Sequence, residues 1–211
     1  MQYLEQRIEI ISTVQAFNVT GLSVGTSGNL SVLVDSGFLI TPTGMAYDDM
    51  KPEDLVVMDT SGMVVCGARQ ASSEWRFHRD IYLSRVEANA VVHVHSPYAT
   101  AIACTRQDIP AFHYMVAIAG GDSIRCAEYA TFGTEQLSAN ALHALRDRNA
   151  CLLANHGMIC LSDSIQSAFK MAQQVEELAR QYYLTTQMGE PVLLDKKEMQ
   201  INLEKFKNYG K

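Results

Sequence analysis

Two histidines, His93 and His95, stand two positions apart in the apolar run AVVHVHSPYAT, residues 90–100. Successive side chains of a β-strand point to opposite faces, so both imidazoles would lie on one face and look into the same space. A third histidine, His156, follows the apolar run CLLA by two positions and precedes a glycine, where the end of a strand can present it at a sheet edge. Three neutral imidazoles with one open position are typical of a catalytic zinc or similar divalent site, whereas core histidines bonded to carbonyl groups are the alternative interpretation.

The other three histidines fit a metal site less well. His78 and His143 fall inside predicted helices, where we expect them to be surface or packing residues, and His113 fits either role. The metal hypothesis therefore depends on one close pair and one distant partner, a pattern that also arises without a metal.

Segments rich in Gly, Ser, Thr and Asn, GTSGNLS at 25–31 and TPTG at 41–44, flank a predicted hairpin and should lie near one rim of the sheet. Their N–H and hydroxyl groups suit a phosphate, although such segments are also ordinary turns, and neither is a Walker loop or a dinucleotide turn. In ASSEW, Ser72 or Ser73 should cap a helix whose first N–H groups favour an anion. Glu74 is then either a surface acid that complements the helix dipole or a carboxylate aimed into the same site.

These residues are carried by helices and strands that alternate along the chain without a linker, repeat or low-complexity stretch. Apolar spacing predicts a first helix that ends near Gly21, with a buried stripe of Leu4, Ile8, Ile11 and Val14. Further predicted elements are hairpins in NLSVLVDSGFLITPTG and LVVMDTSGMVV, helices in SSEWRFHRDIYLSR, in GTEQLSANALHALRDR with Thr134 as N-cap and over 164–187, a strand in SIRCAEY, and a strand or strand pair in ACLLANHGMICL. Hairpins mixed with helices predict an α/β fold with a largely antiparallel or mixed sheet covered by helices on both faces.

Composition narrows the possible classes of protein. A chain of 211 residues with 47% hydrophobic content predicts one domain over 1–211, with a mobile tail from about residue 195. The start MQYLEQRIEIISTVQAF lacks the features of a signal peptide, and no segment is long and apolar enough to span a membrane, so we expect a cytoplasmic protein with no membrane partner. A net charge of -6 argues against a nucleic-acid partner. Five cysteines without a C-x-x-C pair indicate reduced, mostly buried thiols.

Taken together, the blocks GTSGNLSV, LITPTGM, SSEWRFH, AVVHVHSPYATA, IPAFHYMVAIAGG, YATFGT and NHG resemble the class II aldolase/adducin family in order and spacing, and most closely its L-fuculose 1-phosphate aldolase branch. The resemblance runs from the first helix to LEKFKNYG near the carboxyl terminus. It implies a three-layer α/β/α sandwich with a mainly antiparallel central sheet. It also implies a homotetramer whose active sites lie between neighbouring subunits.

The resemblance implies a role for each matching residue. It makes His93, His95 and His156 the ligands of one Zn²⁺ per subunit, with Glu74 as fourth ligand at rest and as acid/base when substrate displaces it. Tyr114 matches a tyrosine contributed to the neighbouring subunit's site, and Tyr209 one of the mobile tail. The implied phosphate-binding residues are Thr26, Gly28, Asn29, Thr43, Gly44, Ser72 and Ser73.

The implied reaction is cleavage of L-fuculose 1-phosphate or a similar deoxy-ketose 1-phosphate to dihydroxyacetone phosphate and a small aldehyde such as L-lactaldehyde. Cleavage needs an electron sink, and a divalent ion is favoured because no lysine lies in a buried-looking strand where it could form a Schiff base. Glu74 would protonate the enediolate carbon and Tyr114 would exchange a proton with the C4 oxygen.

Two alternatives remain open at this point. Sugar-phosphate epimerases and dehydratases of the same family share the metal and phosphate sites, although the block FHYMVAIAGG, with Tyr114, is similar to the aldolase branch. A non-catalytic adducin-like interaction module is the second alternative. Retention of all three histidines and Glu74 argues against that module.

Overall fold

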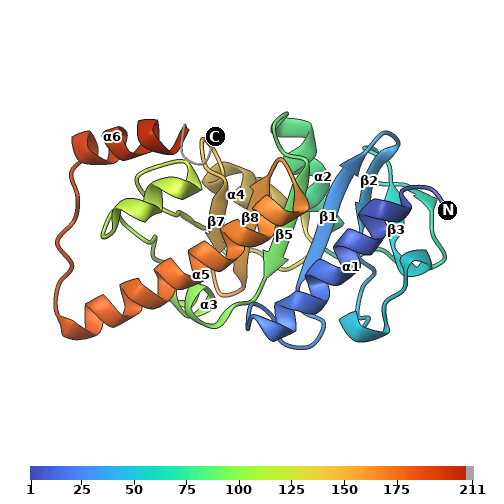
Figure 1. Ribbon diagram of the computed structural model, residues 1–211, viewed down its shortest axis with the longest axis horizontal. Coiled ribbons are helices and arrows are strands. Elements are labelled where there is room, and N and C mark those ends of the chain that lie inside the picture. Colours follow the sequence, from blue (N-terminus) through green and yellow to red (C-terminus); the bar gives the residue numbers. More distant parts are fainter. Residues whose placement is uncertain (208–211) are drawn as a thin grey trace.

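The computed structural model describes residues 1–207, and their strands form one eight-stranded sheet in the order β4-β3-β2-β1-β5-β8-β7-β6 (Figure 1). Within it, β6 and β7 pair in parallel and every other neighbouring pair is antiparallel. The predicted mainly antiparallel sheet is therefore confirmed. The strands are β1 Asn29–Val34, β2 Gly37–Ile40, β3 Val56–Met58, β4 Val64–Cys66, β5 Ala90–Val94, β6 Cys126–Ala127, β7 Ala150–Leu153 and β8 Gly157–Ser162.

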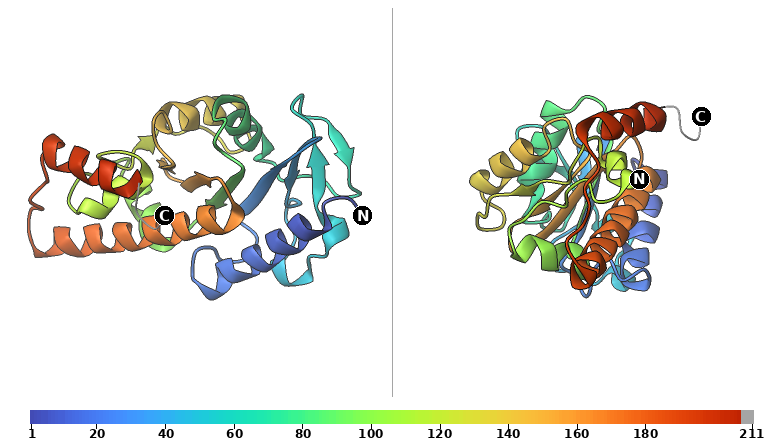
Figure 2. Two further views of the ribbon diagram at one scale, coloured as in Figure 1. Left: turned by 45° about the horizontal axis from the view of Figure 1, so that its top comes forward. Right: turned by 90° about the vertical axis from the view of Figure 1, so that its left-hand side faces the viewer.

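Helices cover both faces of this sheet, as the end-on view in Figure 2 shows. One face carries α1 Leu4–Val19, α3 Pro97–Cys104 and α5 Ile165–Met188, and the other carries α2 Trp75–Ser84 and α4 Glu135–Ala144. Short 3-10 helices are η1 Tyr47–Asp49, η2 Pro52–Asp54 and η3 Tyr114–Ala119. The last helix, α6 Lys196–Lys207, packs against η3. The three-layer α/β/α arrangement is confirmed.

The alternation of side chains along the strands divides the core into two parts. Val91 and Ile159 pack with the helices α2 and α4, whereas their neighbours Val92 and Cys160 pack with α1 and α5. Strand β5 lies between β1 and β8 and is buried along its whole length. A polar side chain on this strand is therefore held by packing on both sides of the sheet.

The register of the strands collects several loops at one edge of the sheet. In an antiparallel pair one strand begins where its neighbour ends. Asn29 at the start of β1 pairs with His93 near the end of β5, and Val94 pairs with Met158 at the start of β8. The segments that precede β1 and β8 and those that follow β2, β5 and β7 thus meet at the same edge.

The first helix is confirmed, but its predicted buried stripe is only partly right: Val14 is buried and Ile11 half-buried. Leu4 and Ile8 are 47% and 53% exposed, and α1 instead buries a face that includes Ile10, Val14 and Arg7. The Arg7 guanidinium donates to the carbonyl oxygens of Pro52 and Leu55, so a charged residue belongs to the buried face. The spacing of hydrophobic residues in the sequence cannot reveal a buried helix face that contains a hydrogen-bonded arginine.

Two other local predictions need correction. Neither serine caps α2, because its N-cap residue is Glu74, whose N–H donates to Ser72 Oγ at 3.3 Å. The segment SIRCAEY forms only the two-residue strand β6. By contrast, the Thr134 side chain accepts from the Leu137 N–H, so the predicted cap of α4 is confirmed.

The cysteines are free, as expected, but they are not mostly buried. Cys151 and Cys160 are buried in the sheet, Cys126 is half-buried, and Cys66 and Cys104 are exposed. No disulfide joins any of them within residues 1–207, which include all five.

The expected tail forms α6 as far as Lys207, and its Met199 is buried while Phe206 packs against the core. Its mobility stays a prediction, and Tyr209 lies outside the described residues. Across residues 1–207, no helix is both long enough and apolar enough to cross a membrane.

Candidate metal centre and substrate cavity

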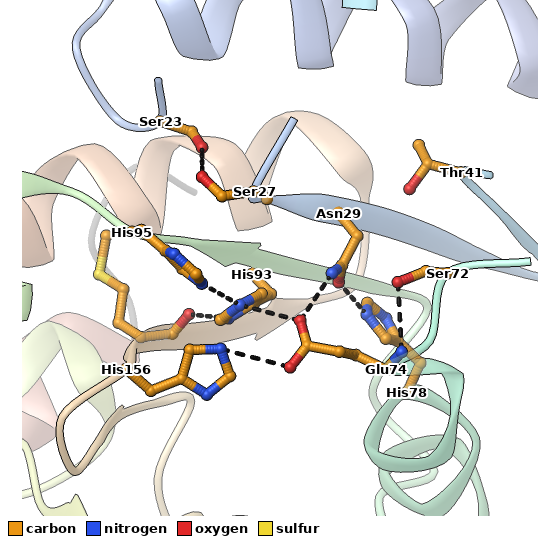
Figure 3. A network of polar contacts seen from close by, with 12 residues as sticks. Ser23, Ser27, Asn29, Thr41, Ser72, Glu74, His78, His93, His95 and His156 are labelled. Carbon is orange, nitrogen blue, oxygen red and sulfur yellow. Dashed lines mark hydrogen bonds and ion pairs between the residues drawn. The ribbon is translucent and has the colours of Figure 1, made fainter. Parts of the chain in front are cut away.

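The three histidines selected from the sequence meet at the sheet edge (Figure 3). His93 lies in β5, His95 follows the end of that strand, and His156 lies in the turn between β7 and β8. Each pair of ring centroids is 4.8 Å apart, and one nitrogen from each ring lies within 4.8 Å of the others. The imidazoles therefore converge closely enough to share one ion.

The backbone sets the protonation of His93. Its Nδ1 lies 2.9 Å from the carbonyl oxygen of Met158, which can only accept, so Nδ1 carries the proton and donates. Nε2 then presents a lone pair toward His95, whose Nε2 is 2.9 Å away. A histidine that donates one N–H to a carbonyl group while the other nitrogen faces the site is the usual arrangement of a metal ligand.

Glu74 completes this cluster from the start of α2. Its carboxylate oxygens lie 3.2 Å from Nε2 of His93 and 3.3 Å from Nε2 of His156. Oε2 accepts from the side-chain amide of Asn29 at 3.0 Å, whereas Oε1 is buried without a hydrogen-bond donor. Lone pairs of nitrogen and oxygen at such distances repel one another unless a proton or cation lies among them. The four side chains therefore fit a divalent cation.

The charge states of the cluster also suit metal ligands. Burial, reinforced by the neighbouring His93, lowers the pKa of His95 to about 3 and that of His156 to about 4, so both rings are neutral at pH 7. For Glu74, burial alone would raise the pKa. The opposing effects of His93, His156 and the Asn29 hydrogen bond bring that pKa down to about 2. Neutral imidazoles and a charged carboxylate are the forms that bind metal.

A cavity of about 390 Å³ opens beside this cluster, and Glu74, His95 and His156 are part of its wall. All seven residues expected to bind phosphate line it: Thr26, Gly28, Asn29, Thr43, Gly44, Ser72 and Ser73. Among the described residues of the wall there is no lysine or arginine. An anion here would be held by hydroxyl and amide donors and by the N-terminal end of α2.

Two glycines are needed for close approach at this edge. A Cβ on Gly157 would lie 2.5 Å from the Val94 carbonyl oxygen and 2.9 Å from Cδ2 of His95, so a side chain there would displace the imidazole. A Cβ on Gly28 would lie 2.8 Å from the carbonyl oxygen of His93. The glycines of the NHG and SGN blocks thus let the chain pass tightly against the histidine strand.

The sequence analysis gave no role to several other residues that line the cavity. Tyr129 and Phe132 line it with exposed fractions of 54% and 64%, and Asn155 lies beside them. The Arg106 side chain links part of this wall, since it donates to Asn155 at 2.9 Å and lies 5.9 Å from the Tyr129 ring. Aromatic residues in the short segment YATFGT between a strand and a helix were the available signal, because exposed aromatics often mark binding surfaces.

The histidines outside the cluster have other roles. His78 is fully buried, and its Nε2 lies 2.6 Å from the side-chain oxygen of Asn29. A surface position is therefore excluded for His78, whereas His143 is exposed. His113 accepts a hydrogen bond from the Met115 N–H at the start of η3 and is not part of the metal cluster.

Tyr114 does not reach the cavity of its own chain. It lies in η3, is 48% exposed, and stacks on Phe206 of α6 at 6.4 Å between ring centroids. The residues around it, which include Phe112 and Leu194, form a separate shallow pocket. The cavity described above therefore holds the metal and phosphate candidates but not this tyrosine.

Comparisons of the sequence and of the structure with known proteins identify the same family. Residues 8–183 match the family described as Class II Aldolase and Adducin N-terminal domain. The chain is 50% identical over 201 residues to a 5-methylthioribulose-1-phosphate/5-deoxyribulose-1-phosphate aldolase of Rhodospirillum rubrum, covering 95% of this chain and 90% of that protein. It is 45% identical to L-fuculose phosphate aldolase of Escherichia coli, covering 96% and 94%. A solved structure titled L-fuculose 1-phosphate aldolase has a TM-score of 0.95 at 42% identity and covers 98% of both chains.

Proposed function

Because this chain belongs to the class II aldolase and adducin family and is an aldolase, we propose that it cleaves a ketose 1-phosphate to dihydroxyacetone phosphate and a small aldehyde. One observation carries the proposal. A single cavity is lined by two of the three convergent imidazoles, by a buried carboxylate with an unpartnered oxygen, and by a cradle of neutral anion donors, with the third imidazole, His93, buried behind them. That combination suits a substrate with a phosphate at one end and a bond to be broken beside a metal.

Class II aldolases are metal-dependent, and we propose zinc as the ion, one per chain, held by His93, His95, His156 and, before substrate binds, Glu74. Three imidazoles and a carboxylate are ligands that zinc accepts. When bound, the ion supplies Lewis-acid stabilisation of the negative charge that develops on substrate oxygens as the carbon–carbon bond breaks.

The substrate phosphate is proposed to bind the hydroxyl and amide groups of the cradle. The amide of Asn29 has two hydrogens, and only one is used by Glu74. Ser72 Oγ accepts from the Glu74 N–H, which leaves its own hydroxyl proton free to donate into the cavity. Anchoring the phosphate there brings the adjacent carbons of the substrate to the carboxylate and imidazoles.

Glu74 is proposed to carry the proton to and from C3 of the dihydroxyacetone phosphate half. Its Oε2 is already bonded to Asn29, so the unpartnered Oε1 is the atom available to hold that proton. Its position at the N-cap of α2 fixes it beside the phosphate serines. A carboxylate placed in this way acts as a general acid–base group.

The aldehyde half of the substrate is proposed to end in an apolar group. Tyr129 and Phe132 add two exposed aromatic side chains to the cavity wall. Relatives are named for L-fuculose phosphate, 5-deoxyribulose 1-phosphate and 5-methylthioribulose 1-phosphate. We therefore propose L-fuculose 1-phosphate or a similar deoxy-ketose 1-phosphate as the substrate, with L-lactaldehyde or a related small aldehyde as product.

A neighbouring copy of the chain is proposed to supply the tyrosines. Tyr114 is half-exposed outside the cavity of its own chain, which supports a role in another copy's site. We propose a homotetramer with active sites between subunits and assign Tyr114 and Tyr209 to the aldehyde end. Five free thiols support a reducing compartment, for which we propose the cytoplasm.

The test is a substrate panel with zinc-loaded protein. L-fuculose 1-phosphate, 5-deoxyribulose 1-phosphate and 5-methylthioribulose 1-phosphate are compared with ketose 5-phosphates and unphosphorylated ketoses. A coupled assay measures release of dihydroxyacetone phosphate, and NMR detects epimerised or dehydrated products. Release from at least one 1-phosphate and from no 5-phosphate is expected. Epimerisation or dehydration without release from any 1-phosphate would overturn the proposal.

A further inference from the structure

A row of buried polar side chains runs from the metal centre along the interface between β1 and α2. Asn29 and Ser31 are two apart on β1 and face α2, because they pair with His93 and Val91 on the same face of the sheet. Glu74, His78 and Tyr82 follow at intervals of four, from the N-cap of α2 along the helix. Four helical residues advance about 6 Å and two strand residues about 6.7 Å, so the two sets of side chains stay in step.

Short hydrogen bonds join the row without a gap. The Asn29 amide nitrogen donates to Glu74 Oε2 at 3.0 Å, and the Asn29 oxygen lies 2.6 Å from Nε2 of His78 (Figure 3). Nδ1 of His78 lies 2.7 Å from Ser31 Oγ, which in turn lies 2.7 Å from the Tyr82 hydroxyl. Ser31 and His78 are fully buried, and Asn29 is 5% exposed.

Chemistry fixes the direction of every donor in this row. A charged carboxylate only accepts, so the NH₂ of Asn29 faces Glu74 and its oxygen faces His78. Nε2 of His78 must therefore carry a proton. Burial lowers the pKa of His78 to about 3, so the ring is neutral and Nδ1 accepts from Ser31. The Ser31 proton is then used, and Tyr82 donates to the serine oxygen.

We propose that His78 is a positioning residue for the aldolase reaction, which holds the Asn29 amide with its NH₂ toward Glu74 and the phosphate cradle. This role rests on the proposed function. If the amide turned over, its oxygen would face the Glu74 carboxylate and the cavity would lose a donor. The Asn29 NH₂ group thus donates to the catalytic carboxylate and faces the anion cradle. Ser31 and Tyr82 keep His78 in the tautomer that orients the Asn29 amide.

Two substitutions of His78 separate positioning from packing. The amide nitrogen of His78→Gln can reach the place of Nε2 and still donate to Asn29, whereas His78→Asn reaches only the place of Nδ1 and contacts Ser31 alone. We expect kcat for ketose 1-phosphate cleavage to fall about 10- to 100-fold in His78→Asn and less than about 3-fold in His78→Gln. Ile81→Val, a buried change on the same helix, is the control for lost stability.

Two measurements on metal-free protein do not depend on catalysis. Inorganic phosphate should bind about 5-fold more weakly to His78→Asn than to His78→Gln or the parent, which corresponds to one lost hydrogen bond. In the parent, ¹⁵N NMR of the ring nitrogens at pH 7 should find His78 protonated at Nε2 only. This measurement needs no variant and stays informative if His78→Asn fails to fold.

The outcomes distinguish this role from the proposed function. A parent protein that cleaves no ketose 1-phosphate contradicts the proposed function, while phosphate binding and the His78 tautomer still test the positioning. Protonation of Nδ1 in the parent would overturn the positioning role. Equal kcat and equal phosphate affinity in the asparagine, glutamine and Ile81→Val proteins would overturn it as well.

Discussion

The cavity and the aromatic corner, which consists of Phe112, His113, Tyr114 and Phe206, are built in opposite ways. At the metal centre beside the cavity, Nδ1 of His93 donates to the Met158 carbonyl oxygen and Oε2 of Glu74 accepts from Asn29, which leaves Nε2 of His93 and Oε1 of Glu74 for a cation. In the corner, Tyr114 lies between His113 at 4.8 Å and Phe206 at 6.4 Å, and its hydroxyl makes no hydrogen bond within residues 1–207. The side chains of the cavity are held by polar contacts, whereas the Tyr114 ring is held by stacking.

This difference indicates how the work of the enzyme is divided. Holding a metal and a phosphate needs donors fixed before substrate arrives, and a single chain can fix them through its sheet register. The phenol of Tyr114 has no such fixation in its own chain, which agrees with use at the site of another copy. Damage to the cavity should therefore abolish binding and chemistry together, whereas damage to the corner should affect only the cleavage step.

The largest effect is expected from His156→Ala. Removing one of three convergent imidazoles should abolish zinc binding and lower aldolase activity by more than about 10⁴-fold, while the fold survives because the site is preformed. Elemental analysis and circular dichroism measure these properties. His143→Ala, which changes an exposed histidine, is the matched control. Full zinc occupancy in His156→Ala would contradict its assignment as a ligand.

The next largest effect is expected from Glu74→Gln, which should slow cleavage about 10⁴-fold. The amide keeps the size of the side chain but cannot take a proton, so exchange of the C3 proton of dihydroxyacetone phosphate with solvent deuterium should stop as well. NMR of the recovered dihydroxyacetone phosphate measures that exchange. Exchange at the parent rate would show that another group moves this proton.

Tyr114→Phe should separate the two regions most clearly. It removes one hydroxyl and keeps the ring stacked on Phe206, so cleavage of the full substrate should slow about 10³-fold. Deuterium exchange into dihydroxyacetone phosphate should continue at the parent rate, because it involves no aldehyde oxygen. If exchange falls along with cleavage, the corner is not specific to the aldehyde half.

Acid should lower the unfolding free energy of the protein because of His78, which is buried beside the cavity. Its folded pKa of about 3 lies below the ordinary value of 6.5, so below pH 6.5 the unfolded chain binds a proton that the folded chain does not. Stability is therefore lost as pH falls. Between pH 6.5 and 4.5 the metal-free parent should lose about 2 kcal/mol more of its unfolding free energy than His78→Gln, measured by urea denaturation. Equal losses in the two proteins would contradict this origin.

The smallest effect is expected from Ser72→Ala. Loss of one hydroxyl donor from a cradle of several should raise KM for a ketose 1-phosphate about 10-fold and leave kcat nearly unchanged. Ser84→Ala, at the exposed other end of α2, should change neither. A comparable rise in KM for an unphosphorylated ketose would place Ser72 outside the phosphate cradle.

Features that depend on neighbouring residues could be predicted from the sequence. The strand alternation that places His93 and the Thr134 cap each depend on a few consecutive positions, and the structure has both. The His93 and His95 pair with His156 also stood out because imidazoles are uncommon in apolar strands. Motif resemblance supplied the cradle residues, all of which line one cavity.

Features that depend on residues distant in the sequence could not be predicted from the sequence. Arg7 belongs to the buried face of α1 only because the carbonyl groups of Pro52 and Leu55, more than forty residues away, accept from it. His78 is polar and mid-helix, and its partners Asn29 and Ser31 lie 49 and 47 positions earlier. The aromatic wall residue Phe132 gave only a weak signal, because a loop aromatic can face solvent or substrate.

Hybrid oligomers test directly whether each site combines Glu74 of one chain with Tyr114 of another. Glu74→Gln and Tyr114→Phe chains carrying different tags are co-expressed, and assemblies that contain both are purified. Sites that join Glu74 from one chain to Tyr114 from the other are then intact, so the hybrids should recover about a quarter of the parent activity. Activity no higher than the mean of the two separate variants would contradict the claim and place Tyr114 in the site of its own chain.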